Sequence, residues 1–337
     1  MEGVTPLGTL DRLIAAALLR DGRASWRRVA EVLGEQERRV ARHGTRLLAS
    51  GAVRIHAQAN PRSHDNGEST FVRVRCAPRS LTAVADRMAD DPRTLWVSVL
   101  AGPAEVVGEY FHGHDELAGI VEDLGRLDDV AGIDARPELH FYRTVSGWAP
   151  GILDDDQLRA LRPSEDARLA AQGDYERPDE TTRALIELLA LHGRTTIDEL
   201  AAALGLSKST VSRRLDAAIS RGQVFIRAVI DPALLGFPVE TVVTIDARPG
   251  ALDRIGGALA ARPDTRWAVS DGSRITAQLA HRDRDHLYDT LRATGEDDAI
   301  TGLVASPVIT IAKRSTIRYR DGAPEPLAGS AAEDVPV

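Results

Sequence analysis

Residues 204–215, LGLSKSTVSRRL, bring hydroxyl, ammonium and guanidinium groups together at the start of an expected helix. Helical spacing places the apolar Val211 and Leu215 on one face and turns Ser209 and Arg213 away from it. Side chains of these types donate hydrogen bonds to phosphate oxygens and to base edges, and arginine paired with guanine is the commonest specific contact in the major groove. The stretch therefore predicts a helix that contacts duplex DNA.

A second copy of this stretch lies 171 residues earlier, where Leu33 to Gly44 read LGEQERRVARHG. The expected DNA contacts are Arg38, Arg39, Arg42 and Arg46 in the first copy and Ser207, Lys208, Ser209, Thr210, Ser212, Arg213 and Arg214 in the second. A solvated surface helix is the alternative, but the alignment of Arg42 with Arg213 favours DNA contact. Glu35 and Glu37 would face phosphates, so we expect the first copy to bind more weakly.

The repeat extends through most of the chain. Trp96 aligns with Trp267 at the same offset, and after one slipped residue near Gly102 Pro137 aligns with Pro307. A long unit that occurs only twice excludes a solenoid and indicates a tandem of two-domain units.

Each unit begins with three expected helices, because apolar residues recur at helical spacing within 9–50 and in the aligned part of the second unit. Ser25 and Thr196 are typical N-caps, and Gly34 and Gly205 are suited to the tight turn before each third helix. In the first unit, Gly44 stands at the core position that Leu215 holds in the second.

Each third helix is followed by an alternating strand that ends at Asn60–Pro61 or Asp231–Pro232. The continuation reads strand, helix, strand, strand, helix, strand, which is the ferredoxin-like order. We therefore expect an α+β protein with two helix-turn-helix domains, each followed by a ferredoxin-like βαββαβ domain. The expected bounds are 1–60 and 177–232 for the helix-turn-helix domains, 68–145 and 238–320 for the ferredoxin-like domains, 146–176 for a linker with room for one short helix, and 321–337 for a disordered tail.

Charge is distributed unevenly along the 337 residues. The whole chain has a formal charge of −8, but residues 1–60 carry +4 and residues 177–231 carry +1, which leaves −13 for the remainder. Mildly basic segments beside acidic ones are typical of a DNA-contacting domain joined to a separate assembly domain.

Several other kinds of site are not expected. The single cysteine, Cys76, is interpreted as a small core residue, and the pair His112 and His114 lacks a third metal ligand. The acidic run Asp154–Asp156 is interpreted as solvated, so neither a metal nor a cofactor is expected. No long apolar run and no signal-peptide pattern occur, so we expect a cytoplasmic protein without a membrane partner.

The order of these features resembles the Lrp/AsnC family of bacterial transcription regulators in a double-length form. The resemblance rests on the three helices, the strand closed by Asp231–Pro232, the run LLGFPVE at 234–240, and a glycine at the turn between the second and third strands of each ferredoxin-like domain. It implies a DNA-binding domain and an effector-sensing domain whose sheets pair, within the chain or with another copy. The implied partners are double-stranded DNA, a small-molecule effector such as an amino acid or another metabolite, and further copies of the chain in a dimer or higher homo-oligomer.

The resemblance also implies where an effector binds. The sensing turns contain Leu100, Ala101 and Gly102 in the first unit and Asp271, Gly272, Ser273 and Arg274 in the second. Here the turns read GPAE and GSRI, whereas family members tend to carry an aromatic and an acidic residue.

Two other functions remain open, although no enzyme activity is expected. Siroheme decarboxylases resemble this architecture, but the Tyr, Arg and His cluster of that family does not occur in TLWVSVLAG or TRWAVSDGS. An assembly module that has lost DNA binding would fit the acidic excess. If the chain does bind DNA, two unequal helix-turn-helix units indicate an asymmetric operator, because identical ones in a homodimer favour palindromes.

Overall fold

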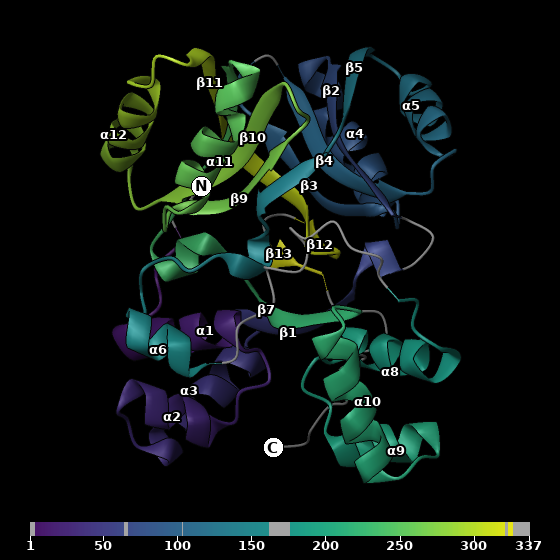
Figure 1. Cartoon of the computed structure of the whole chain (residues 1–337), viewed down its shortest axis with the longest axis vertical. Coiled ribbons are helices and arrows are strands. Elements are labelled where there is room, and N and C mark those ends of the chain that lie inside the picture. The colour runs from purple at the N-terminus through teal and green to yellow at the C-terminus, as the bar shows by residue number, and fades with distance from the viewer. Residues whose placement is uncertain (1–3, 64–66, 103, 162–175, 321–322, 326–337) are drawn as a thin grey trace.

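The computed structural model describes residues 4–63, 67–102, 104–161, 176–320 and 323–325. Figure 1 shows two helical domains at one end of the molecule, two sheet domains at the other, and a two-stranded ribbon between them. Within these segments, no helix combines the length and the apolar character that crossing a membrane requires.

The first helical domain consists of α1 (Thr9–Arg20), α2 (Trp26–Leu33) and α3 (Glu37–Ala49). Ser25 caps α2, because its side chain accepts a hydrogen bond from the Arg28 amide at 3.1 Å. Gly34 ends α2 in a left-handed conformation (φ 66°) that suits glycine. The expected cap and turn are confirmed.

The second helical domain repeats this arrangement with α8 (Glu180–Leu191), α9 (Ile197–Leu204) and α10 (Lys208–Ser220). Thr196 and Glu199 form a reciprocal capping box at the start of α9, and Gly205 is again left-handed (φ 65°). Val211, Leu215 and Ala218 of α10 are buried, as their spacing predicts.

Gly44 does not leave the gap that its alignment with Leu215 suggests. A Cβ atom added to Gly44 would lie 2.3 Å from the Cζ3 atom of Trp26, so the indole fills this space. The guanidinium carbon of Arg194, from the second helical domain, lies 4.5 Å from the centre of the Trp26 ring. The first helical domain is therefore well packed at a position that looked weak in the sequence.

The ribbon consists of β1 (Val53–Ala59) and β7 (Val224–Ile230), paired antiparallel. His56 lies opposite Arg227, and these two residues are also equivalent in the repeat. An equivalent pair at the centre of an antiparallel ribbon defines a local twofold axis. The two helical domains therefore approximate the halves of a symmetric dimer within one chain.

The two sheet domains each have the expected βαββαβ order. The first contains β2 (Glu68–Cys76), α4 (Leu81–Asp90), β3 (Thr94–Leu100), β4 (Glu105–His112), α5 (Leu117–Gly125) and β5 (Val130–Pro137). The second contains β8 (Val239–Ala247), α11 (Leu252–Ala260), β9 (Thr265–Ser270), β10 (Arg274–His281), α12 (Arg284–Gly295) and β11 (Ile300–Arg314). Short 3-10 turns follow several strands: η1 (Pro61–Ser63), η2 (Pro78–Ser80), η3 (Val145–Gly147), η4 (Pro232–Leu235) and η5 (Pro249–Ala251).

Strand exchange joins the sheet domains into one continuous sheet, ordered β5-β2-β4-β3-β11-β8-β10-β9-β6. The end of β11 crosses to the first domain, where Thr310 lies opposite Val99. In return, β6 (His140–Arg143) adds to the edge of the second domain, with Phe141 opposite Val269. The sheets thus pair within the chain, one of the two arrangements that the resemblance implied.

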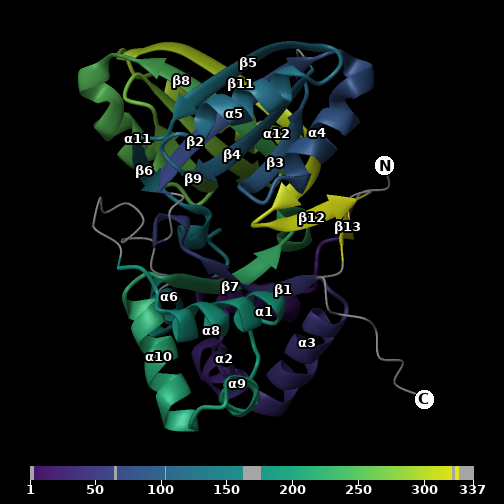
Figure 2. The same ribbon diagram turned by 90° about the vertical axis from the view of Figure 1, so that its right-hand side faces the viewer.

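Helices α4 and α5 cover the outer side of one half of this sheet, and α11 and α12 cover the other (Figures 1 and 2). The inner faces meet in an apolar cluster of Phe71, Leu100, Val107, Phe141, Val242, Trp267 and Val269. The Trp96 and Trp267 rings lie 5.0 Å apart at its centre, so the aligned tryptophans meet across the pseudo-twofold axis.

The segment after β6 is more ordered than a polar linker. It contains the short helix α6 (Asp155–Ala160), and Trp148, Leu153 and Leu161 are buried in the core of the first helical domain. Residues 162–175 lie outside the described part of the chain. In the expected tail, Ala323–Pro324 form β13, which pairs with β12 (Ile317–Arg320), and residues 326–337 again lie outside the description.

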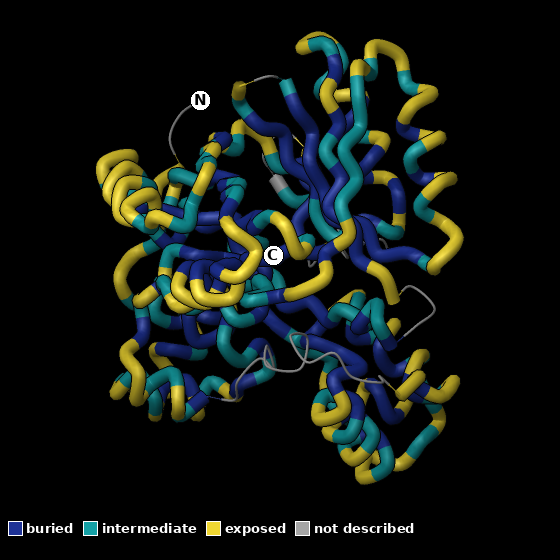
Figure 3. The backbone as a smooth tube through the Cα atoms, turned by 45° about the horizontal axis from the view of Figure 1, so that its top comes forward, coloured by how far each residue is buried: buried dark blue, intermediate teal, exposed yellow. Residues whose placement is uncertain are grey.

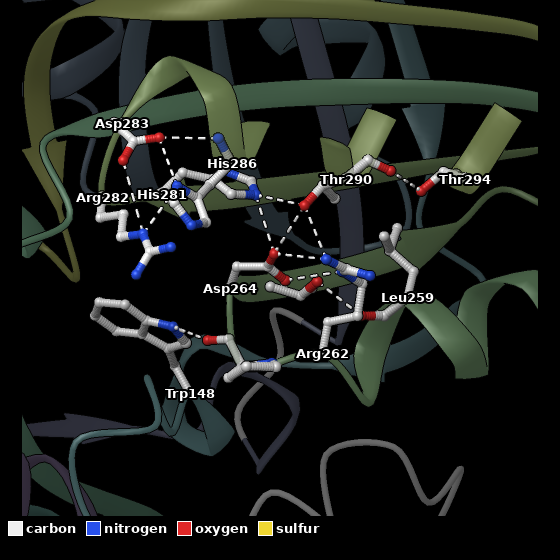
Figure 4. A network of polar contacts seen from close by, with 12 residues as sticks. Trp148, Leu259, Arg262, Asp264, His281, Arg282, Asp283, His286, Thr290 and Thr294 are labelled. Atoms are coloured by element: carbon white, nitrogen blue, oxygen red, sulfur yellow. Dashed lines mark hydrogen bonds and ion pairs between the residues drawn. The ribbon is translucent and has the colours of Figure 1, made fainter. Parts of the chain in front are cut away.

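Trp148 connects this segment to the second sheet domain (Figure 4). Its Nε1 donates a hydrogen bond of 3.0 Å to the Pro263 carbonyl. The neighbouring Asp264 carboxylate accepts a hydrogen bond from Arg262 and lies 3.0 Å from Nε2 of the buried His281. The first helical domain is thereby fixed to the second sheet domain.

Candidate nucleic-acid interface and sensing turns

The outer surface of α10 presents hydrogen-bonding groups to solvent. Ser209 and Arg213 are exposed, and Thr210 is half-buried on the flank. Within the described structure, the guanidinium group of Arg213 forms no ion pair or hydrogen bond. Arg213 is therefore free to contact a ligand, as its outward position predicts.

Three other predicted contacts of α10 have partners inside the domain. Ser207 caps the helix, accepting a hydrogen bond from the Thr210 amide at 3.2 Å. Lys208 Nζ lies 2.5 Å from the Asp198 carboxylate of α9, on the exposed surface. Arg214 Nη1 donates to Asp179 at 2.6 Å and so ties α10 to the start of α8. Lys208 can exchange its partner for a phosphate, whereas Arg214 is part of the domain scaffold.

Ser212 does not face outward as expected. It is half-buried and lines a cleft of about 510 Å³ between the helical domains, together with Asp216 and, from the other domain, Arg28. The helical domains form separate lobes whose outward helical surfaces are largely exposed (Figure 3). The cleft side of α10 is thus distinct from the side that carries Arg213.

The first recognition helix, α3, exposes all four predicted arginines. Arg39 pairs with Glu35 at 3.0 Å, and Arg46 pairs with Asp11 at 2.8 Å. The guanidinium groups of Arg38 and Arg42 have no such partner among the described residues. Arg42 and its equivalent in α10 therefore share both exposure and an uncommitted guanidinium group.

A reciprocal pair of arginines joins the helical domains, and sequence reasoning assigned it no role. Arg23 donates to the carbonyls of Gly193 (2.7 Å) and Thr195 (3.1 Å). Arg194 donates to the carbonyls of Gly22 (2.9 Å) and Ala24 (3.0 Å). The alignment of Gly22–Arg23 with Gly193–Arg194 in the repeat was the feature of the sequence that could have indicated this pair. We call these contacts the arginine clamp.

Glycine is required beside each clamp arginine because the opposite ribbon strand passes close by. A Cβ atom on Gly22 would lie 3.0 Å from the Arg227 Cα, and one on Gly193 would lie 2.8 Å from the Ile55 carbonyl oxygen. The Gly193 amide also donates to that carbonyl at 3.1 Å. The clamp and these close approaches fix each helical domain on the ribbon.

The predicted sensing turns both lie at the junction of the sheet domains. In the first, Leu100 is buried, Gly102 is exposed, and the Ala101 amide donates to the Pro307 carbonyl of the second unit at 2.8 Å. In the second, Asp271 lies 3.2 Å from Arg136 of the first unit. The structure thus places each turn against the opposite unit.

Asp271 organises the second turn. Its carboxylate accepts hydrogen bonds from the amides of Ser273 (2.8 Å) and Arg274 (2.7 Å). Burial opposes ionisation, but these hydrogen bonds and Arg136 hold the pKa of Asp271 below its usual value. Gly272 has a left-handed backbone (φ 85°), which suits glycine at the turn.

The two histidines of the first unit differ in their exposure to solvent. His112 is fully buried and shares a 2.8 Å hydrogen bond with the Thr70 hydroxyl, whereas His114 is exposed and contacts Glu68. Strand register aligns His112 with His281, because both pair with equivalent residues, Glu68 and Val239. In the described segments, no group of three or more His, Cys, Asp or Glu side chains is arranged to hold a metal.

Comparisons with known proteins agree with this arrangement. A family model described as winged helix-turn-helix DNA-binding matches residues 178–224. An HTH-type transcriptional regulator of Pyrococcus abyssi is 30% identical over 112 residues, which cover 71% of that protein and 32% of this chain. The HTH-type transcriptional regulator LrpA of Pyrococcus horikoshii is 28% identical over 127 residues, covering 90% of LrpA and 36% of this chain. Each relative corresponds in length to about one unit.

The two-unit arrangement also has a counterpart among solved structures. The siroheme decarboxylase NirDL superposes on 93% of this chain and 94% of its own with a TM-score of 0.60. At 13% sequence identity, this likeness concerns the fold.

Proposed function

We propose, from the premise that this chain belongs to the Lrp/AsnC family of helix-turn-helix transcriptional regulators, that its two helical domains bind one DNA duplex together. The observation that carries the proposal is the equivalence of Arg42 and Arg213. Both are exposed on the second helix of a helix-turn-helix, the helix that enters the major groove in this motif, and both are unpaired within the described chain.

Two substitutions in α10 distinguish base contacts from phosphate contacts. Arg213→Ala should weaken binding by about 1 to 3 kcal/mol and relax preference at one operator position. Lys208→Ala should weaken binding to all sequences alike and reduce the slope of log affinity against log salt by roughly one unit. Binding titrations at several salt concentrations on specific and unrelated duplexes measure both effects. Arg126→Ala, at the exposed residue that follows α5, is the control.

If neither α10 variant changes the sequence preference of the protein, α10 is not the recognition helix. If the unaltered protein binds neither its own upstream DNA nor duplexes selected from a random pool, the assembly-module alternative is favoured.

We propose that a small-molecule effector, an amino acid or another metabolite, binds at the sensing turns. The position of each turn against the opposite unit supports this, because a ligand there would touch both units. A thermal-shift screen of metabolites tests it, since a ligand that prefers the folded state raises the melting temperature. Asp271→Asn should remove the shift, whereas Asp253→Asn on α11 should not.

We also propose that the protein acts in the cytoplasm and that copies associate through the sheet domains. Among the described residues, the outer strands β5 and β6 each pair on one side only, which leaves a sheet edge for association. Light scattering coupled to size-exclusion chromatography measures the number of copies.

The decarboxylase alternative rests on the whole-chain likeness to NirDL. It predicts a Soret band that remains with the protein after incubation with an iron tetrapyrrole and gel filtration. A DNA-binding regulator without that activity should show sequence-specific binding and no conversion of the tetrapyrrole.

A further inference from the structure

Two pockets flank the Trp96–Trp267 pair where the sheet domains face the ribbon. They are related by the repeat, since the two tryptophans pair across their strands with Glu109 and Gln278 respectively. In each pocket the indole Nε1 donates to that partner, at 2.8 Å and 3.0 Å. In a symmetric dimer these pockets would be identical, so their differences show what the duplication has changed.

The first pocket, which we call the glutamate pocket, contains two buried carboxyl groups. The Ser69 hydroxyl lies within hydrogen-bond distance of both the Glu109 and the Glu138 carboxyl groups. Burial and the neighbouring carboxylate raise the pKa of Glu138 well above its usual value. The two carboxyl groups therefore share Ser69 as a hydrogen-bond partner.

The second pocket, which we call the arginine pocket, receives one polar side chain from each strand of the second sheet domain. Arg266 Nη1 donates to Glu240 at 2.7 Å and to Gln278 at 2.8 Å. Arg314 donates to both oxygens of Glu240, at 2.7 Å and 3.2 Å. The repeat places Leu95 and Thr144 at the positions of these two arginines, as strand pairing confirms. The second unit therefore has two guanidinium groups at positions where the first unit has none.

Two buried guanidinium groups share one directly bonded carboxylate in the arginine pocket. Arg266 and Arg314, both about 4% exposed, converge on Glu240. Asp231 also acts on both arginines electrostatically, and Arg227 acts on Arg266. Burial and the neighbouring arginines lower the pKa of Arg266 to about 9. Two buried guanidinium groups that share one carboxylate are costly unless a further counter-charge binds.

The pocket also contains unused hydrogen-bond donors. The Nε atoms of Arg266 and Arg314 are both buried, and neither has an acceptor among the described residues. Buried polar groups of folded proteins are nearly always hydrogen-bonded, so two orphaned donors on neighbouring arginines indicate a missing acceptor. Carboxylate and phosphate oxygens are the acceptors that match a guanidinium group best.

We propose that the arginine pocket binds a small organic oxyanion, a carboxylate or phosphate group, through Arg266 and Arg314. The free space beside the arginines is about 20 Å³, which admits one small anionic group. Trp96 and Trp267 line the pocket, so the carbon atom that carries this group has an apolar surface to pack against. This site is separate from the sensing turns, and binding there does not depend on DNA binding.

Calorimetric titration and thermal unfolding of the full-length protein, without DNA, test the proposal. The probes are acetate, methyl phosphate and neutral acetamide, at constant ionic strength. At least one anion should bind and raise the melting temperature, while acetamide should do neither; the anion that binds more strongly identifies the preferred oxyanion. Arg266→Met and Arg314→Met should weaken that binding at least tenfold. The matched control, Glu109→Gln, gives the glutamate pocket the side chain found at Gln278 and should leave affinity unchanged.

Arg314→Lys keeps the charge without the guanidinium Nε, so it should retain part of the affinity and provides a test if a methionine variant does not fold. Circular dichroism verifies the fold of each variant. The proposal is overturned if neither anion binds the unaltered protein, if acetamide binds equally well, or if folded arginine variants bind as the unaltered protein does.

Discussion

Arg42 and Arg213 occupy equivalent positions in different electrostatic surroundings. Glu37 is exposed at the start of α3, where the second unit has Lys208. A carboxylate there repels phosphates, so Arg42→Ala should weaken DNA binding less than Arg213→Ala does. Titration of both variants at one salt concentration measures the difference. Glu37→Gln should strengthen binding, and a larger effect of Arg42 than of Arg213 would reverse the ranking of the two recognition helices.

We expect His56 to make the stability of the ribbon depend on pH. It is 7% exposed, shares hydrogen bonds with the Ala190 carbonyl (3.2 Å) and the Thr316 hydroxyl (2.7 Å), and faces Arg227. Burial, and then Arg227, lower the pKa of His56 from 6.5 to about 4. Between these values the unfolded chain binds more protons than the folded one, so the free energy of unfolding should fall as pH falls through this window.

Substitution of His56 isolates this contribution. At pH 4.5 the lowered pKa of His56 should reduce the free energy of unfolding by about 2 to 3 kcal/mol, whereas above pH 6.5 it should not change that free energy. The difference in unfolding free energy between the His56→Gln variant and the unaltered protein should therefore change by about that amount between pH 7.5 and pH 4.5 in urea titrations. The variant difference is needed because the raised pKa of Glu138 acts in the opposite direction. The exposed His140→Gln is the control, and an equal change there would refute the role of His56.

Single helices were predictable because their signals are local. The spacing of Val211 and Leu215 determines which face of α10 is buried, and Gly205 marks the preceding turn without reference to the rest of the chain. The partners of Lys208 and Arg214 depend on how α10 packs against α9 and α8, which periodicity does not describe. Trp26 of α2 fills the space beside Gly44 of α3 that a leucine side chain fills in the second unit. Because this contact joins two helices, the sequence of α3 alone indicated a packing defect where none exists.

The arginine clamp acts between elements and does not lie on the recognition helices. Arg23 and Arg194 each donate to two carbonyls of the opposite domain, so Arg23→Ala or Arg194→Ala should cost about 1 to 3 kcal/mol of stability by leaving buried acceptors unpaired. DNA affinity should fall because the spacing of the recognition helices is released, but the salt slope should stay the same. Chemical denaturation and salt-dependent titration measure the two effects, with Arg292→Ala of α12 as control. A reduced salt slope would instead identify the clamp arginines as phosphate contacts.

At the scale of the whole molecule, the duplication turns a dimer-like architecture into one chain. The ribbon centred on His56 and Arg227 and the exchange of β6 and β11 reproduce the contacts of two symmetric copies. The ferredoxin-like order was evident from the sequence, but the strand exchange was not, because long-range pairing leaves no periodic signal along the chain. Once the copies are fused, each position is free to change in one unit alone, as the arginine and glutamate pockets demonstrate.

The two DNA-contacting surfaces can also differ from each other once the copies are fused, so we expect an asymmetric operator. A pseudo-twofold axis presents the two recognition helices in opposite directions, as required for an inverted repeat. The helices differ at their leading positions, however, since residues 37–42 read ERRVAR and residues 208–213 read KSTVSR. The selected site should therefore consist of two unlike half-sites, about one helical turn or a multiple of it apart.

Making the two recognition helices alike should restore symmetry. A variant with Glu37→Lys, Arg38→Ser, Arg39→Thr and Ala41→Ser gives α3 the leading sequence of α10, while Val40 and Arg42 already match. Glu37, Arg38 and Arg39 are exposed, and Ala41 is half-buried outside the buried core of α3, so the core of the domain is preserved. Selection from random duplexes, followed by footprinting, should yield unlike half-sites for the unaltered protein and a palindrome of the α10 half-site for the variant. A palindromic site for the unaltered protein, retained without change by the variant, would mean that the differences between α3 and α10 do not determine which bases are read.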